Sequence, residues 1–169
     1  MKKDKSIELL NKAVADELAA VHQYMYFHFH CDDQGFVLLS NLFKRTAIEE
    51  MMHVERLADR ILFLKGEVEM KPAVEVTKIH DVKAMLKMAS EMETQSANDY
   101  NAWANECAQN ADSVSKKVFE LLVEEEERHF DQYDKEMENL ENYGDNYLAL
   151  QSIERSKTIT GAPPAASGN

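Results

Sequence analysis

The chain has 169 residues, a length typical of one domain with a buried core, and only five glycines and three prolines interrupt it. Helix-forming residues dominate the remainder, which favours an all-α fold over a fold of strands and tight turns. The formal net charge of −12 argues against a surface that neutralises a phosphate backbone, so nucleic acid is not an expected partner.

Nothing near the start predicts export or membrane insertion. Glu8, Lys12 and Asp16 break any apolar segment of the kind a signal peptide needs. No run approaches the roughly 18 apolar residues of a membrane span, so a membrane is not an expected partner. The two cysteines form neither a CxxC motif nor a disulfide framework, and a reducing, cytoplasmic location is therefore expected.

The first two helices follow from apolar residues spaced three and four apart. Such spacing predicts a helix over residues 5–33, which ends in the sequence CDDQGF at Gly35. A second periodic run covers residues 36–64 and ends at Gly66. The short turn between these helices predicts that they are antiparallel.

Residues 66–80 contain Pro72 and several β-branched residues without helical period, so they predict an extended connection. This length is unusual between neighbouring helices, but it can run along a bundle of about 40 Å. The next helix, predicted over residues 81–110, could then start at the opposite end. One long crossover of this kind is typical of certain four-helix bundles.

A fourth helix is expected to begin at an N-cap, Asp112 or Ser113, and to reach Tyr143 before Gly144. The sequence DNYLALQSIER then predicts a short fifth helix. We therefore expect one domain over residues 1–155 and a disordered tail over residues 156–169. The predicted fold is an all-α four-helix bundle with one long crossover between the second and third helices.

Acidic residues on the apolar faces of these helices share a common spacing. Glu17 to Glu50 and Glu93 to Glu126 are each 33 positions apart, so each predicted hairpin presents two glutamates at matching height. His53 and His129 follow the second glutamate of each pair by three positions, which places Glu and His on one helix face. Six side chains are thus expected to converge in the bundle interior.

Four converging carboxylates would repel one another and would be poorly solvated unless cations lay among them. Two divalent ions balance the four charges, and neutral imidazoles complete the ligand set. Oxygen-rich ligands with two imidazoles suit iron or manganese better than a structural zinc site, and iron is the leading expectation. Glu50 and Glu126 are the expected bridging ligands, while Glu17 and Glu93 are expected to bind one ion each.

The sequence resembles the bacterioferritins, the haem-containing ferritins of bacteria. Three segments carry the resemblance: LNKAVADELAAVHQY, IEEMMHVERLADRILFLKG and EEEERHFDQYDKEMENLENYGDNYLAL. The resemblance implies that residues 1–155 form a ferritin-like di-iron domain and that the chain builds a 24-subunit cage from twofold dimers. It also implies ferroxidase activity, in which Fe(II) is oxidised by dioxygen or hydrogen peroxide and the Fe(III) is stored. The implied ferroxidase ligands are Glu17, Glu50, His53, Glu93, Glu126 and His129.

The resemblance also implies roles outside these ligands. Tyr24 matches a tyrosine beside the di-iron site, where it could donate an electron or a hydrogen bond, although ordinary packing explains it equally well. Met51 matches the methionine that binds haem iron, one from each of two subunits, and a thioether is a suitable axial ligand. The implied cofactors are two iron ions per subunit and one haem shared between two subunits, with a ferredoxin-type reductant as partner.

The chain departs from the pattern at several positions. Arg45 and Glu49 replace a histidine and an aspartate that form an inner-surface iron site in some members, so that site is not expected here. Gln132 replaces a tryptophan that some members use as an electron donor. Cys31 and Cys107 are expected at opposite ends of antiparallel helices and cannot pair within one subunit.

Three alternative functions remain open at this point. A rubrerythrin-like di-iron peroxidase uses the same metal chemistry, but this chain lacks the cysteine pairs of a rubredoxin centre. A non-enzymatic haem-binding helical assembly would leave the carboxylate site vestigial. A DNA-protecting mini-ferritin has its metal site between subunits and commonly a basic tail, which this chain lacks. Gel filtration, metal analysis and oxidation assays distinguish these functions from an iron-storing ferroxidase.

Overall fold

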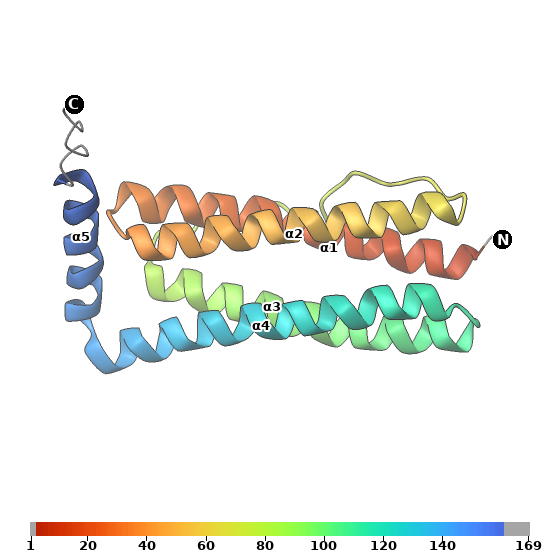
Figure 1. Cartoon of the computed structure of the whole chain (residues 1–169). Helices are drawn as coiled ribbons and strands as arrows, with labels where there is room; N and C mark the ends of the chain where they lie inside the picture. The colour runs from red at the N-terminus through yellow and green to blue at the C-terminus, as the bar shows by residue number, and fades with distance from the viewer. Residues whose placement is uncertain (1–2, 161–169) are drawn as a thin grey trace, which may run out of the picture.

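The computed structural model describes residues 3–160, with only the backbone described for residues 154–160. These residues form helices and no strand (Figure 1). The described residues form four long helices, which lie along one axis, and a shorter fifth helix, which crosses one end of them. The predicted all-α bundle with a fifth helix is confirmed. The helices are α1 (Asp4–Asp33), α2 (Val37–Phe63), α3 (Val82–Gln109), α4 (Ser113–Tyr143) and α5 (Asp145–Thr160).

Side-chain caps fix where the second hairpin starts and turns. The Asp81 carboxylate accepts a hydrogen bond from the Ala84 backbone N–H at 2.8 Å, at the start of α3. Asp112 accepts from the Ser115 N–H at 3.1 Å, so Asp112 rather than Ser113 is the N-cap of α4. These caps satisfy backbone donors that have no partner within the helix.

The crossover between α2 and α3 runs back along the bundle, as predicted (Figure 1). Two amides of α1 hold its backbone. Asn11 pairs with Glu67 O and Glu69 N, both at 2.9 Å, and Gln23 pairs with Thr77 O at 3.0 Å and Thr77 N at 2.8 Å. Because α3 therefore starts at the end of the bundle where α2 starts, α3 is parallel to α2 and antiparallel to α1.

The apolar interior consists of two clusters that lie toward opposite ends of the bundle. One contains Leu57, Phe119 and Cys107, and the other contains Phe43, Leu86 and Cys31. Both cysteines are buried free thiols, which confirms that they do not pair within the chain. The helix faces between the two clusters carry the buried polar side chains described below.

The fifth helix extends beyond its predicted end. We expected it to stop near residue 155, whereas α5 continues to Thr160; the domain boundary at residue 155 and the disordered tail stay predictions. The helix is longer because neither glycine nor proline occurs between Gly144 and Gly161. Residues 161–169 lie outside the described part of the chain. In the second turn of α5, Gln151 accepts a hydrogen bond from the Leu39 N–H at 3.3 Å, which fixes α5 to the first turn of α2.

None of the helices within residues 3–160 is both long enough and apolar enough to cross a membrane.

Candidate metal centre

Six buried ionisable side chains meet between the two hairpins. Each long helix contributes to the group, and every member is at most 2 % exposed. The helix periodicity explains this placement: each Glu lies on the apolar face of its helix, and the histidines lie three residues later on the same face. The members are Glu17 on α1, Glu50 and His53 on α2, Glu93 on α3, and Glu126 and His129 on α4.

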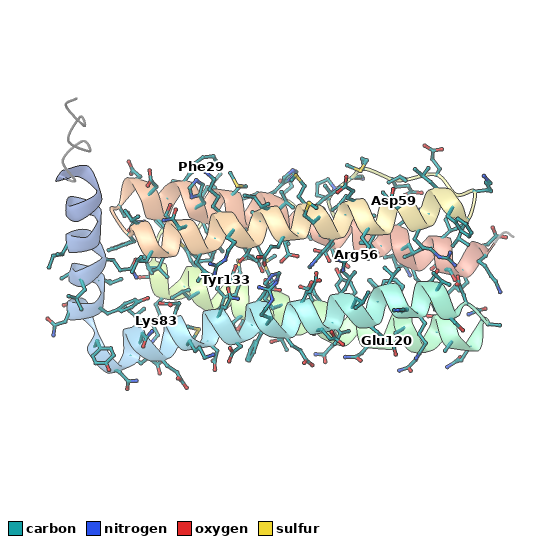
Figure 2. The ribbon with its side chains drawn as sticks, in the orientation of Figure 1. Phe29, Arg56, Asp59, Lys83, Glu120 and Tyr133 are labelled. Atoms are coloured by element: carbon teal, nitrogen blue, oxygen red, sulfur yellow. The ribbon has the colours of Figure 1, made fainter. Side chains whose placement is uncertain are left out.

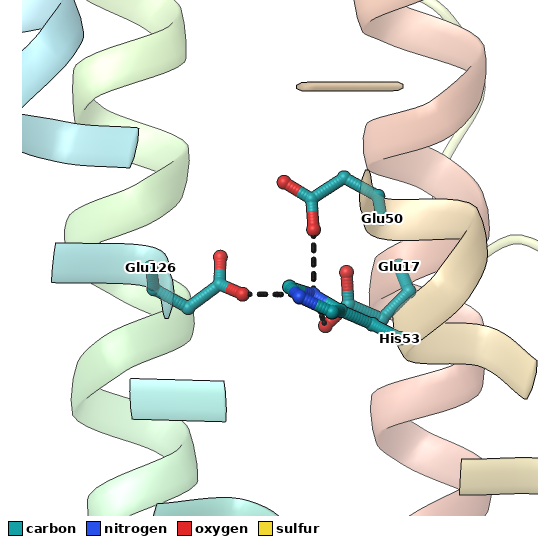
Figure 3. A group of neighbouring side chains, drawn as sticks. All are labelled: Glu17, Glu50, His53 and Glu126. Carbon is teal, nitrogen blue, oxygen red and sulfur yellow. Dashed lines mark ion pairs between the residues drawn. The ribbon is translucent and has the colours of Figure 1, made fainter. Parts of the chain in front are cut away.

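The six side chains form two overlapping groups of possible ligands. Glu17 and His53 complete the first group and Glu93 and His129 complete the second, while Glu50 and Glu126 belong to both. Within each group, one ligand atom per residue lies within 4.8 Å of all the others. Figure 3 shows the first group, with Glu126 approaching from the opposite side to the residues of α1 and α2.

Both imidazoles turn the same nitrogen toward the carboxylates. His53 Nδ1 lies 2.8 Å from Glu50 Oε2, 3.1 Å from Glu126 Oε1 and 3.4 Å from Glu17 Oε1. His129 Nδ1 lies 3.1 Å from Glu50 Oε1 and 3.5 Å from Glu93 Oε2. The two rings are nearly parallel, with an interplanar angle of 24° and centroids 5.9 Å apart. Each Nδ1 is therefore placed to share a metal ion with carboxylate oxygens.

The atoms that face the middle of this group have no hydrogen-bond partner. They are both oxygens of Glu50, Oε1 of Glu126, and Nδ1 of His53 and of His129. Buried polar atoms are nearly always hydrogen-bonded, and each unsatisfied one costs about 1–3 kcal/mol. Since all five atoms are good metal ligands that converge on one space, the residues fit a pair of bound cations.

Electrostatic interactions in the group are strong. Burial, reinforced by the Glu17 carboxylate, raises the pKa of Glu50. Burial and the charges of Glu50 and Glu17 raise the pKa of Glu126 well above its usual range. Burial disfavours the charged form of His129, but Glu50 and Glu93 outweigh it and raise its pKa to about 10. Without a cation the cluster therefore retains protons at neutral pH, and an incoming cation must displace them.

A second carboxylate lies behind each histidine. The Nε2 atom of His129 lies 2.6 Å from Glu49 Oε2, and Glu49 also accepts a hydrogen bond from Arg128 at 2.9 Å. His53 Nε2 makes the corresponding contact with Glu125. These contacts orient each ring so that Nδ1 points inward, and carboxylates behind metal-binding histidines commonly do this.

The sequence analysis missed the role of Glu125 and considered Glu49 only for an inner-surface iron site. The available signal was their position, because each directly precedes the glutamate of a Glu-x-x-His pair. Arg56, labelled in Figure 2, points from α2 toward α4 and lies 3.4 Å from Glu125. Arg45, which like Glu49 departs from the family pattern, donates a hydrogen bond to the Gln132 side-chain oxygen at 2.9 Å.

Two tyrosines cross the bundle to the outer carboxylates. The Tyr24 hydroxyl on α1 donates a hydrogen bond to Glu93 on α3, and the Tyr100 hydroxyl on α3 donates to Glu17 on α1 at 2.6 Å. Tyr24 was singled out from the sequence, whereas Tyr100 was missed. The signal was present, because each tyrosine follows a ligand-position glutamate by seven residues. Burial, followed by the adjacent carboxylate, raises the pKa of both phenols and keeps them protonated.

Met51 lies apart from this centre. Its side chain is 53 % exposed on α2, whereas the adjacent Glu50 is fully buried. Met52 is 50 % exposed, so both methionines of the EEMMH segment point outward. The part of the chain described here thus leaves a thioether available on the outer face of α2.

The chain is similar to proteins of known family over most of its length. Residues 7–143 match the ferritin-like domain family. The bacterioferritin of Desulfovibrio desulfuricans is 36% identical over 94% of this chain and 89% of its own length. The bacterioferritin of Rhodobacter capsulatus is 32% identical over 86% of this chain and 91% of its own length, and that of Brucella melitensis is 30% identical over 83% and 88%.

Proposed function

The chain belongs to the bacterioferritins, a family of ferritin-like proteins, and from this premise we propose that it stores iron by oxidising Fe(II) at the buried carboxylate centre. The observation that carries the proposal is the pair of overlapping ligand groups that share Glu50 and Glu126. The unsatisfied atoms of the centre support the binding of two cations rather than a neutral polar network.

In the proposed centre, Glu17 and His53 would hold one Fe(II) ion, and Glu93 and His129 would hold the other. Glu50 and Glu126 would serve both ions, because their carboxylates lie in both groups. Glu49 and Glu125 hold the imidazole rings, and Tyr24 and Tyr100 hold the outer carboxylates. Carboxylates favour Fe(III) over Fe(II), since a harder cation gains more from anionic oxygen ligands, so the ligand set promotes oxidation.

Each Fe(II) ion gives up one electron in the proposed reaction. Two ions supply two electrons, which with two protons reduce hydrogen peroxide to two waters, or reduce dioxygen to hydrogen peroxide. The protonated histidines and glutamates of the metal-free centre lose protons when Fe(II) binds. The resulting Fe(III) is then stored as mineral in a cage of 24 subunits built from twofold dimers.

We further propose that Met51 is an axial ligand of a haem shared across the dimer twofold. Its exposure on α2 supports this role, because a ligand for a group between subunits must point away from its own bundle. Haem bound there would supply one-electron transfer, with a ferredoxin-type protein as the reductant for iron release. The buried free thiols support a reducing, cytoplasmic setting.

A stopped-flow assay of Fe(II) oxidation tests the proposed function. The variant Glu50→Ala/His129→Ala removes a shared carboxylate and one imidazole, and we expect it to lose the fast oxidation phase while still eluting as a cage. Glu55→Ala, an exposed glutamate of the same helix, is the matched control and should oxidise Fe(II) at the parent rate. Unchanged fast oxidation in the double variant would refute the assigned centre. Elution of the parent protein as a dimer would refute the cage.

A further inference from the structure

A surface pocket of about 310 Å³ lies between the amino-terminal half of α2 and the carboxy-terminal half of α4. These two helices run in opposite directions along the bundle (Figure 1). Neighbouring turns of each helix form the walls, because the contributing residues follow one another by three or four positions. They are Leu38, Asn41, Leu42 and Arg45 on α2, and Gln132, Lys135 and Glu136 on α4. None of them belongs to the two ligand groups of the metal centre, so this pocket is a separate feature.

Arg45 differs from the other arginines whose side chains the structure describes. Arg56, Arg60 and Arg128 each pair with a carboxylate, at 3.4, 2.7 and 2.9 Å. No carboxylate of the described residues lies within ion-pair distance of Arg45, which donates one hydrogen bond, to the Gln132 side-chain oxygen. A guanidinium has about five N–H donors in a planar fork, so most of them remain for a ligand.

The polar groups around Arg45 suit an anion. Because the oxygen of the Gln132 amide accepts from Arg45, its NH2 group keeps both donors. Lys135 adds a second positive charge, and its contact with Asp131 joins two exposed side chains, a kind of pair that contributes little in water. Glu136 is the acidic member of the lining, and burial raises its pKa, so it is protonated more readily than an exposed glutamate. With both basic groups charged, the lining carries a net positive charge.

The size of the pocket and its setting favour a small oxyanion. Four water-sized oxygens need about 120 Å³ at about 30 Å³ each, so one phosphate ion fits with room for several waters. Arginine binds such ions through two parallel hydrogen bonds, and lysine binds them as a point charge. The whole chain carries a formal charge of −12, so anions are repelled from most of its surface and a positive pocket is a local exception.

We propose that the α2–α4 pocket binds an inorganic tetrahedral oxyanion, of which phosphate is the expected ion, with Arg45 as its bidentate ligand and Lys135 as a second positive charge. The proposal does not depend on the proposed iron chemistry, because no residue of the pocket is a ligand of the metal centre. It gives a counter-ion to Arg45, the one described arginine side chain that pairs with no carboxylate.

Phosphate binding to the metal-free, assembled protein tests the proposal. The full-length protein is treated with chelator, and isothermal titration at a fixed neutral pH measures saturable binding of inorganic phosphate. Arg45→Gln removes the fork, Arg45→Lys keeps its charge without the fork, and Lys135→Gln removes the second charge. Lys44→Gln and Lys117→Gln each remove one charge at exposed positions of the same two helices outside the pocket, and they are the matched controls.

We expect Arg45→Gln to weaken phosphate binding about 10- to 100-fold, because the ion then loses its charge-assisted hydrogen bonds. Lys135→Gln should weaken it about 3- to 10-fold, since Lys135 is exposed and also contacts Asp131. The affinity of Arg45→Lys should fall between those of the parent and Arg45→Gln. Lys44→Gln and Lys117→Gln should bind within about twofold of the parent, because exposed charges outside the pocket are screened by salt.

Crystals soaked in selenate, a heavier tetrahedral oxyanion, locate the bound ion through its anomalous signal. The proposal requires a peak within hydrogen-bond distance of Arg45 and Lys135. It is overturned if the parent shows no saturable phosphate binding, or if the selenate peak lies elsewhere. Equal weakening in Arg45→Gln and Lys44→Gln would also overturn it, because the attraction would then come from overall charge and not from the pocket. Since no iron is present, these results are independent of whether the metal centre oxidises Fe(II).

Discussion

Replacing Glu50 with leucine should have opposite effects on the metal-free and the metal-loaded protein. Glu50 is completely buried, and neither of its carboxylate oxygens has a hydrogen-bond partner. Its pKa is raised, so burial disfavours its charge. A leucine of similar size removes these unsatisfied atoms and adds apolar contacts between the two core clusters. We therefore expect the metal-free variant to be more stable than the parent.

The magnitude follows from the unsatisfied atoms. Two buried polar oxygens without partners cost about 1–3 kcal/mol each. Part of this is offset by attraction to the imidazoles, since Glu50 lies 2.8 Å from His53 Nδ1 and 3.1 Å from His129 Nδ1. A net gain of about 2 kcal/mol remains, which for a chain of this length raises Tm by about 4–8 °C.

Metal reverses the comparison. Glu50 belongs to both ligand groups, so its loss should weaken the binding of both metal ions. A bound metal at about 1,000 times its dissociation constant stabilises the native protein by about 4 kcal/mol per site. The parent should gain this stabilisation from Co(II), whereas Glu50→Leu should gain little. The stability order of the two proteins thus inverts between chelator and metal.

Thermal unfolding of the assembled proteins measures both effects at one fixed protein concentration, first with chelator and then with excess Co(II). Glu55→Leu controls for a leucine on an exposed position of α2 and should gain Co(II) stability like the parent. If metal-free Glu50→Leu melts at a lower temperature than the parent and Glu55→Leu, then the Glu50 carboxylate already has adequate polar partners in the native state. That result would remove the argument from unsatisfied atoms.

Three further outcomes follow from the same geometry. The affinity for metal should rise by at least about tenfold per pH unit from pH 6.5 toward 10. The reason is that the pKa of His129 is raised to about 10, so its imidazole retains a proton that stabilises the metal-free protein below pH 6.5 and is lost as pH rises. Co(II) titrations at several pH values measure this affinity, and a pH-independent affinity would contradict the prediction. Glu125→Gln should weaken Co(II) binding about 10- to 100-fold by releasing the His53 ring, whereas Glu124→Gln should not, as isothermal titration can determine. Tyr100→Phe should weaken the binding of one of the two ions about 5- to 10-fold, because a charge-assisted hydrogen bond to Glu17 is lost. A two-site titration would then show two different dissociation constants.

The positions of the six ligands could be predicted because they rest on two regular periods. Helical spacing places Glu50 and His53 on one face, and the equal separation of the paired glutamates brings the hairpins to matching height. The crossover was predictable for a similar reason, since fifteen residues without helical period can span the bundle. These features depend on chain geometry, which the sequence carries directly.

The supporting side chains were harder to predict because they depend on contacts across the bundle. Glu93 follows Glu17 by 76 positions, and the same shift relates Tyr24 to Tyr100 and Glu49 to Glu125. This repeat marks a pseudo-twofold relation between the hairpins that would have identified Tyr100 and Glu125. Without the fold, a glutamate next to a ligand residue is explained equally well as a surface charge. A tyrosine on the apolar face of a helix is explained equally well by core packing.

The most direct test of the central claim is an anomalous-difference map at the iron absorption edge from crystals exposed to Fe(II). The account predicts two peaks per chain among the six buried side chains. One should contact Glu17 and His53, the other Glu93 and His129, and both should lie within coordination distance of Glu50 and Glu126 oxygens. A single peak, or iron bound away from these residues, would contradict it.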